Sequence, residues 1–170
     1  NINTPLSAFI RYAEKKKLPV AEEVIRKALQ HISWKGRMQL LSQKPIIIID
    51  GAHNVHGVKA LMSTLEKIFP NRKVKFMVSI LGDKDYKQML SLICPKAEQI
   101  YVARNQSERA ASVEDQVAVI EEYNIPYKTA YTVTEAYALA VKECKPDDIL
   151  IVCGSLFTVG EVLEFQKDNA

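Results

Sequence analysis

Residues 46–54 read IIIIDGAHN, four isoleucines followed directly by a polar turn. β-Branched residues without polar alternation are typical of a strand buried on both faces, as in a parallel sheet. Gly51 permits a sharp turn, and a helical pattern follows from about Val55 to Phe69. Ligands of open parallel sheets bind outside the carboxyl ends of the strands, so Asp50 lies where a carboxylate can meet a ligand. The alternative is that Asp50 only caps the following helix.

Strand and helix patterns alternate along the rest of the chain. This alternation predicts an α/β fold, a Rossmann-like, mostly parallel twisted sheet of about six strands with helices on both faces. Right-handed crossovers then place the polar loops 50–54, 82–85, 103–109 and 154–155 along one edge of the sheet. We expect strands near 38–41, 45–50, 74–81, 99–102, 126–131 and 148–153, and helices near 55–69, 84–93, 113–123, 134–143 and 158–167.

Two helical patterns, residues 5–17 and 21–31, precede the α/β region. The loop around residues 33–37 breaks their periodicity. We therefore predict a boundary there, with a helical tail of an adjoining domain over 1–33 and the α/β domain over 34–170. Because the chain opens on Asn1 within a helical pattern, we expect it to be a piece of a longer protein.

Composition excludes several classes of function. A net charge of +3 and basic residues without interleaved aromatics give no support for a nucleic-acid partner. No apolar stretch is long enough to span a bilayer, so no membrane association is expected. Cys94, Cys144 and Cys153 are odd in number and widely spaced, which indicates a reducing, cytoplasmic setting and argues against disulfides and a zinc knuckle.

Two residues suggest contacts with a nucleotide. Arg37 follows the flexible Gly36, and its guanidinium could donate two hydrogen bonds to a phosphate. The alternative for Arg37 is a surface ion pair. Asp50 is suited to accept hydrogen bonds from two ribose hydroxyls.

Two further turns could bind anions. The sequence GDKD at 82–85 follows a strand, so its backbone N–H groups and Lys84 could face an anion. Ser155, after Gly154, could donate to a carboxylate. In the alternative interpretation, Asp85 and Ser155 are simply helix caps.

Metal and phosphoryl-transfer motifs are missing. His53 and His56 are three residues apart, but two histidines without a carboxylate fall short of a metal set, so no metal site is predicted. The chain has no GxGxxG, GxxxxGK[ST] or GxSxG sequence. Complete phosphoryl chemistry is therefore not expected from this chain alone.

Four motifs in series resemble the C-terminal domain of folylpolyglutamate synthases and bifunctional dihydrofolate synthases, within the Mur ligase family. They are WKGRMQ at 34–39, IDGAHN at 49–54, GDKD at 82–85 and GSLF at 154–157. The resemblance implies an ATP-dependent ligase that joins L-glutamate to folate through an acyl phosphate. It also implies that ATP lies between this domain and a central P-loop domain, that residues 1–33 are the tail of that central domain, and that the missing domain holds the Mg²⁺ ligands.

The same resemblance implies roles for six residues. Arg37 would contact the ATP phosphates, Asp50 the ribose and Asn3 the adenine. His53, Lys84 and Ser155 would surround the incoming glutamate and the reacting phosphate, with His53 and Lys84 as the catalytic pair. Many relatives have proline where this chain has Val55, and because such a proline only preorganises the helix start, we expect little functional loss.

Without the central domain, the chain alone is expected to be inactive. Two alternatives stay open at this stage. One is a nucleotide-binding α/β module without ligase activity, in which Lys84 and Ser155 only begin helices. The other is the equivalent domain of a cell-wall Mur ligase.

Overall fold

The structure is a computed structural model that describes residues 3–30 and 34–169. The chain divides into two compact units, Asn1–Trp34 and Lys35–Ala170. That the first unit is the tail of a further domain stays a prediction. The first unit contains two helices, α1 (Asn3–Lys15) and α2 (Glu22–Gln30).

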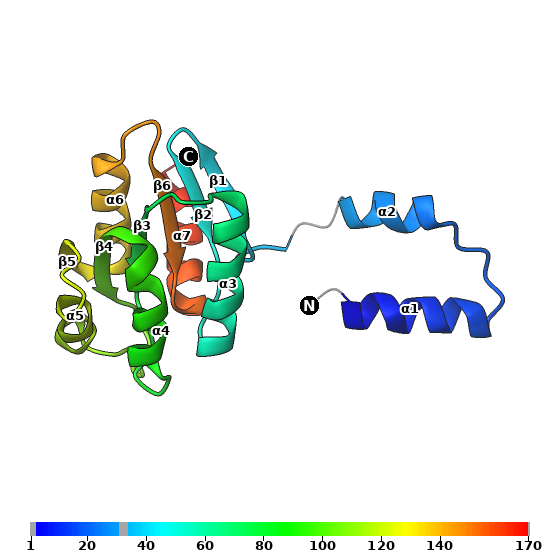
Figure 1. Cartoon of the computed structure of the whole chain (residues 1–170), viewed down its shortest axis with the longest axis horizontal. Coiled ribbons are helices and arrows are strands. Elements are labelled where there is room, and N and C mark those ends of the chain that lie inside the picture. Colours follow the sequence, from blue (N-terminus) through cyan, green and yellow to red (C-terminus); the bar gives the residue numbers. More distant parts are fainter. Residues whose placement is uncertain (1–2, 31–33, 170) are drawn as a thin grey trace. The chain divides into compact units, whose positions relative to one another are not determined.

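The second unit is built on one six-stranded sheet (Figure 1) with the strand order β1-β2-β6-β3-β4-β5. The edge strand β1 pairs with β2 in antiparallel fashion, and every other pairing is parallel. The predicted fold class, a mostly parallel α/β sheet of about six strands, is confirmed. The strands are β1 (Gln39–Gln43), β2 (Ile46–Ile49), β3 (Val74–Val78), β4 (Ala97–Arg104), β5 (Tyr127–Thr132) and β6 (Ile149–Cys153).

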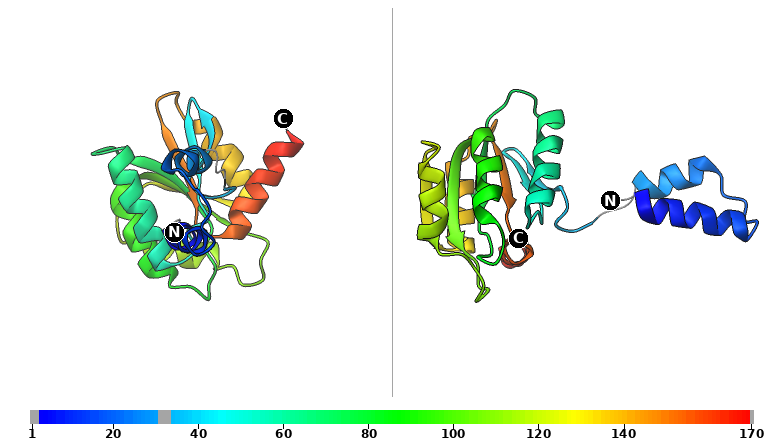
Figure 2. Two further views of the ribbon diagram at one scale, coloured as in Figure 1. Left: turned by 90° about the vertical axis from the view of Figure 1, so that its right-hand side faces the viewer. Right: turned by 60° about the horizontal axis from the view of Figure 1, so that its bottom comes forward.

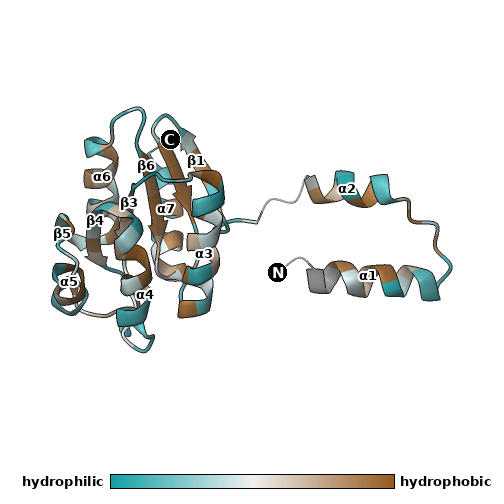
Figure 3. Ribbon diagram, viewed as in Figure 1, coloured by the Kyte–Doolittle hydropathy of each residue, from teal (hydrophilic) through white to brown (hydrophobic). Residues whose placement is uncertain are grey.

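The isoleucine run of β2 is buried on both faces of the sheet, as its sequence indicates. Ile48 packs into the apolar core on one face, and Ile47 and Ile49 pack into the core on the other. Successive side chains of a strand point to opposite faces, so one strand contributes to both cores. Figure 3 shows the same character in β2 and β6, which are hydrophobic along their length.

Helices cover both faces of the sheet (Figures 1 and 2). Three helices pack with one core and two with the other, which gives three layers. The first group is α3 (Val55–Ile68), α4 (Tyr86–Ile93) and α5 (Val113–Glu121); the second is α6 (Val133–Glu143) and α7 (Leu156–Asp168), and a short 3₁₀ turn, η1 (Cys94–Lys96), joins α4 to β4. No helix in the described part of the chain has the length and apolar content that crossing a membrane requires.

Several element boundaries differ from the predicted ones by two or three residues, and two of these differences lie next to the loop after β3. Strand β3 ends at Val78, although the apolar pattern continues to Leu81, because the backbone carbonyl of Ser79 leaves the sheet ladder and accepts a hydrogen bond from the Thr158 hydroxyl at 2.9 Å. Helix α4 begins at Tyr86 rather than near 84, because Asp85 is its N-cap. Both shifts lengthen the loop after β3 and leave it at the carboxyl edge of the sheet.

Candidate functional site

Asp50 directly follows β2 and connects two backbone segments. Its Oδ2 accepts the Met38 N–H and its Oδ1 accepts the Ala52 N–H, both at 2.9 Å. The N-cap of α3 is Asn54, whose side chain accepts the Gly57 N–H at 2.8 Å, so the interpretation of Asp50 as a helix cap is wrong. Each carboxylate oxygen has two acceptor positions, so both can still accept a ligand hydroxyl.

Arg37 lies over the turn that follows Asp50. Gly36, in a left-handed conformation at φ +71°, accepts the Gly51 N–H on its carbonyl at 2.7 Å. This bond brings the exposed Arg37 close to Gly51. A Cβ atom added to Gly51 would lie 3.5 Å from Nη1 of the Arg37 guanidinium. The same Cβ would lie 2.4 Å from the end of the Leu156 side chain, which would have to move to admit it. The structure therefore places a guanidinium beside the turn that follows Asp50.

His53 is oriented by a single backbone contact. Its Nδ1 lies 2.8 Å from the Gly51 carbonyl oxygen. Because a carbonyl only accepts, Nδ1 carries the hydrogen, and Nε2 of the neutral ring is an acceptor. His53 precedes the N-cap of α3 whereas His56 lies within that helix, so the two do not share a helix face. No three His, Cys, Asp or Glu side chains in the described ranges are close enough together to hold a metal ion.

Lys84 lies in the loop after β3, beside two other charged groups. Its Nζ is 3.4 Å from Oδ2 of Asp83, and Nη1 of Arg109 is 2.9 Å from the same oxygen. The N–H groups of Gly82 and Lys84 donate to backbone carbonyls within the protein. We therefore expect an anion to meet the ammonium group of Lys84 rather than these two N–H groups. Asp85 is the N-cap, as the alternative interpretation of this turn held.

Ser155 is buried at the start of α7. Its Oγ accepts the Phe157 N–H at 3.1 Å, so it caps the helix, as the alternative interpretation held. A hydroxyl has one donor besides its acceptor positions, so capping does not prevent Ser155 from donating to a ligand. The preceding Gly154, at φ +112°, donates its N–H to the Ala52 carbonyl at 3.0 Å and so joins this turn to the one after β2.

Cys153 ends β6 under this turn and is no candidate nucleophile. Complete burial, and then the charge of Asp50, raise the pKa of its thiol far above the ordinary value. The nucleophilic form of cysteine is the thiolate, which is therefore not populated at neutral pH. The other two cysteines, Cys94 and Cys144, are also free thiols.

The structure brings the predicted residues of the second unit to one edge of the sheet. Backbone contacts join the turns after β2 and β6 to residues 36–38, and the loop after β3 adjoins them because β3 pairs with β6. Asn3 begins α1 in the first unit, and its side chain lies outside the described part of the chain. The residues gathered at this edge are Arg37, Asp50, His53, Lys84 and Ser155.

Arg109 and a buried glutamine, Gln116, were not predicted as site residues. Arg109 ends the loop 103–109, which the sequence already placed at this edge of the sheet. An arginine in a loop at that edge could therefore have been predicted as an anion-binding residue. Gln116 is fully buried in α5 and binds backbone groups of two loops. Its sequence position carried no signal, because a glutamine in an amphipathic helix is usually exposed.

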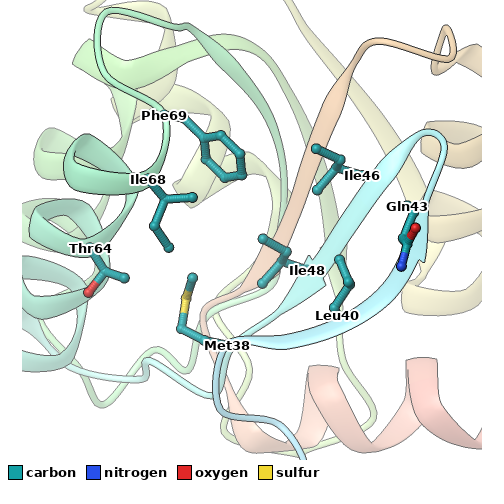
Figure 4. Close-up of a pocket in the computed structure, with 8 residues that line it drawn as sticks. All are labelled: Met38, Leu40, Gln43, Ile46, Ile48, Thr64, Ile68 and Phe69. Carbon is teal, nitrogen blue, oxygen red and sulfur yellow. The ribbon is translucent and has the colours of Figure 1, made fainter.

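The structure also contains an apolar groove (Figure 4). It has a volume of about 520 Å³ and lies between the β1–β2 hairpin and α3. None of the five predicted residues lines it. The groove does reach the Asp50 turn through Met38, whose N–H donates to Asp50. Its lining is Met38, Leu40, Gln43, Ile46, Ile48, Thr64, Ile68 and Phe69.

Known proteins resemble the chain in sequence and in fold. Residues 36–156 match the model of the family described as Mur ligase, glutamate ligase domain. A dihydrofolate synthase/folylpolyglutamate synthase of Escherichia coli is 30% identical over 147 residues, which cover 86% of this chain and 34% of that protein. The solved structure of Escherichia coli FolC in complex with DHPP and ADP superposes with a TM-score of 0.81 at 28% identity, covering 89% of this chain and 36% of that one.

A second solved structure is a bifunctional folylpolyglutamate synthase/dihydrofolate synthase with Mn, AMPPNP and L-glutamate bound. It has a TM-score of 0.79 at 32% identity and covers 94% of this chain and 37% of that one. The chain thus spans about a third of the length of the relatives it matches.

Proposed function

Because the chain belongs to the Mur ligase family, by its glutamate ligase domain, we propose that it is the C-terminal domain of a folylpolyglutamate synthase-type ligase. The whole enzyme would use ATP to join the amine of L-glutamate to a carboxylate of folate. The carboxylate oxygen attacks the γ-phosphorus and ADP leaves; the amine then attacks the acyl carbon, and phosphate and a proton leave. The observation that carries the proposal is the gathering of Arg37, Asp50, His53, Lys84 and Ser155 at one edge of the sheet.

The nucleotide contacts follow from charge and position. Arg37 is exposed beside the Asp50 turn, where its guanidinium can bind the phosphates of ATP. Asp50 is 8% exposed, yet each oxygen accepts one backbone N–H and has room for one ribose hydroxyl. Asn3 is proposed to contact the adenine.

The glutamate contacts follow from donors and acceptors at the same edge. Lys84 offers an ammonium group and Ser155 a hydroxyl to the carboxylates of glutamate. His53 presents Nε2 as an acceptor, so it can take the proton that the attacking amine releases. The positive charges of Arg37 and Lys84 oppose the negative charge that gathers when a dicarboxylate meets a triphosphate.

The rest of the site would come from the remaining two thirds of the enzyme. We propose that a central P-loop domain binds the other side of ATP and supplies the ligands of a divalent cation, Mg²⁺, because the described residues of this chain contain no such set. The Mn- and AMPPNP-bound relative supports the need for a divalent cation. Closure of the two domains would exclude water from the acyl phosphate. This chain alone would be inactive, and three free thiols suit a cytoplasmic setting.

The test is a coupled assay of ADP formation by the full-length ligase, with product masses measured in parallel. We expect ADP release to require both L-glutamate and folate, and the folate product to gain one glutamate residue per turnover. Nucleotide binding without glutamate-dependent ADP release would favour the module without ligase activity. Turnover with a nucleotide-linked cell-wall precursor in place of folate would favour the other branch of the family.

Lys84 can be tested separately against a matched lysine. Lys84→Ala should raise the KM for glutamate about tenfold, the effect of losing one hydrogen bond to a charged group. Lys73→Ala is the control, because Lys73 is an exposed lysine that donates to the Pro95 carbonyl, near the opposite edge of the sheet. An unchanged KM in Lys84→Ala would return Lys84 to the role of a helix-start residue.

A further inference from the structure

The loop after β4 is held against the loop after β3 by backbone hydrogen bonds. The Ala111 N–H donates to the Ile80 carbonyl at 2.9 Å, and the Gly82 N–H donates to the Arg109 carbonyl at 2.7 Å. These bonds flank an isolated antiparallel bridge between residues 81 and 110. The backbone of Arg109 is therefore fixed directly across from the turn that carries Lys84.

Buried polar side chains also hold the loops after β3 and β4 together. Gln116, which is fully buried, accepts the Ile80 N–H at 3.1 Å and donates to the carbonyls of Ala111 and Ser112 at 3.4 and 3.2 Å. The Asn105 N–H donates to Oγ of the fully buried Ser79 at 2.8 Å. Leaving any of these groups unpaired in the interior would cost about 1–3 kcal/mol, so the loop is anchored and not free to swing away.

Arg109 and Lys84 approach one carboxylate oxygen. Nη1 of Arg109 is 2.9 Å and Nζ of Lys84 is 3.4 Å from Oδ2 of Asp83. The three side chains stay partly exposed, at 58%, 33% and 40% respectively. Both cations share one carboxylate oxygen, and a guanidinium and an ammonium together have eight N–H donors, more than that oxygen can accept.

We propose that Arg109 is a second cationic residue of the glutamate subsite and binds one carboxylate of the incoming amino acid, with Lys84 near the other. The inference rests on the proposed function and deepens it. L-Glutamate carries two carboxylates, and one cation accounts for only one of them. Arg109 supplies the planar, forked donor that binds a carboxylate through two parallel hydrogen bonds. Asp83 holds both cations in place before the substrate arrives.

A surface ion pair without a ligand is the competing explanation of Arg109. Exposed pairs are frequent and contribute little to stability. Two observations favour the subsite: the anchored backbone of Arg109, and its position at the edge where the other site residues gather. Arg72 provides the contrast, since it is an exposed arginine near the opposite edge and donates to the Asp147 carbonyl at 2.6 Å.

The experiment compares Arg109→Ala, Arg109→Lys and the control Arg72→Ala in the full-length ligase. The KM for L-glutamate, the KM for ATP and kcat are measured for each, together with the midpoint of thermal unfolding. We expect Arg109→Ala to raise the KM for glutamate about tenfold or more, with the KM for ATP and the thermal midpoint near wild type. Arg109→Lys should give an intermediate KM because it keeps the charge and loses the fork. Arg72→Ala should behave as wild type.

Several results would overturn the proposal. An unchanged KM for glutamate in Arg109→Ala leaves only the surface pair. A rise in the KM for ATP instead would make Arg109 a phosphate contact. A fall in thermal midpoint with a general loss of activity would make it structural. If the wild-type ligase shows no glutamate-dependent turnover, the proposed function has failed and this subsite with it; if wild type is active and only Arg109→Ala is indistinguishable from it, the subsite alone has failed.

Discussion

Replacing Asp50 by alanine removes two hydrogen bonds and one proposed ribose contact together. The hydrogen bonds are those that its two oxygens accept from the N–H groups of Met38 and Ala52. A loss of stability and a loss of nucleotide binding are therefore both expected. The prediction is useful only if the two can be measured separately.

The size of the stability loss follows from the burial of the two N–H groups. Ala52 is 1% exposed, so its N–H would find no water, at a cost of about 1–3 kcal/mol. Met38 is half-buried, and water can replace part of its bond. We expect Asp50→Ala to destabilise the chain by about 2–4 kcal/mol in total, less than the 5–15 kcal/mol typical of a whole domain. The variant should remain folded at room temperature.

Stability is measured by urea unfolding of the 170-residue chain, and binding by the KM values of the full-length ligase for ATP and for 2′-deoxy-ATP. If Asp50 binds the ribose hydroxyls, wild type should prefer ATP by about tenfold or more, and Asp50→Ala should lose that preference. A displaced turn alone would raise both KM values equally. Asp147→Ala, at an exposed carboxylate near the opposite edge of the sheet, should leave stability and both KM values near wild type.

Two results would refute this reasoning. If Asp50→Ala unfolds at the wild-type urea concentration, the two N–H groups do not depend on the carboxylate. If the variant keeps the preference for ATP over 2′-deoxy-ATP, the ribose contact is wrongly assigned, whatever happens to stability.

Two other predictions concern stability. Gly154→Ala should destabilise the chain by about 2 kcal/mol or more, because the φ of Gly154 is +112° and an added Cβ would lie 2.9 Å from the Ser79 carbonyl oxygen. The control Gly160→Ala, where the Cβ meets open space, should instead stabilise the chain by about 0.5–1 kcal/mol. Equal midpoints of urea unfolding for the two variants would contradict this prediction. Burial opposes ionisation of Asp148, but hydrogen bonds from Lys75 and a backbone N–H outweigh it and lower the pKa of this carboxyl. The ionised carboxylate therefore contributes to folding stability above its ordinary pKa of 3.8, and this contribution is lost as the pH falls through the lower pKa of the folded state. Lys75→Met should therefore cost about 3 kcal/mol at pH 7 and make the loss of stability below pH 4 shallower, and an unchanged acid profile would argue against the pair.

The fold was predictable because its determinants are local. Four consecutive isoleucines followed by a polar turn indicated β2, and periodic apolar residues indicated the helices. The end of β3 was misplaced because Ile80 and Leu81 are as buried as the strand, although they lie outside the ladder. An apolar sequence pattern indicates which residues are buried, and here the buried residues continue beyond the last residue of the hydrogen-bonded strand.

The candidate site was predictable in its position and less so in its contacts. The rule that loops gather at the carboxyl ends of parallel strands placed Asp50, Lys84 and Ser155 together. The sequence could not decide whether Asp50 or Asn54 caps α3, since both are good capping residues. The pairing of Arg109 with Asp83 joins residues 26 positions apart, and no local pattern encodes such a contact.

Hydrogen exchange on the full-length ligase, with and without L-glutamate and a non-hydrolysable ATP analogue, tests most directly whether these turns form one binding edge. We predict slower exchange of backbone amides on ligand binding in residues 36–38, 51–54, 82–85, 109–111 and 154–156, with no change in the turns 71–73 and 145–148 that precede β3 and β6. Unchanged exchange in the first set, or slowing confined to the second, would contradict the account.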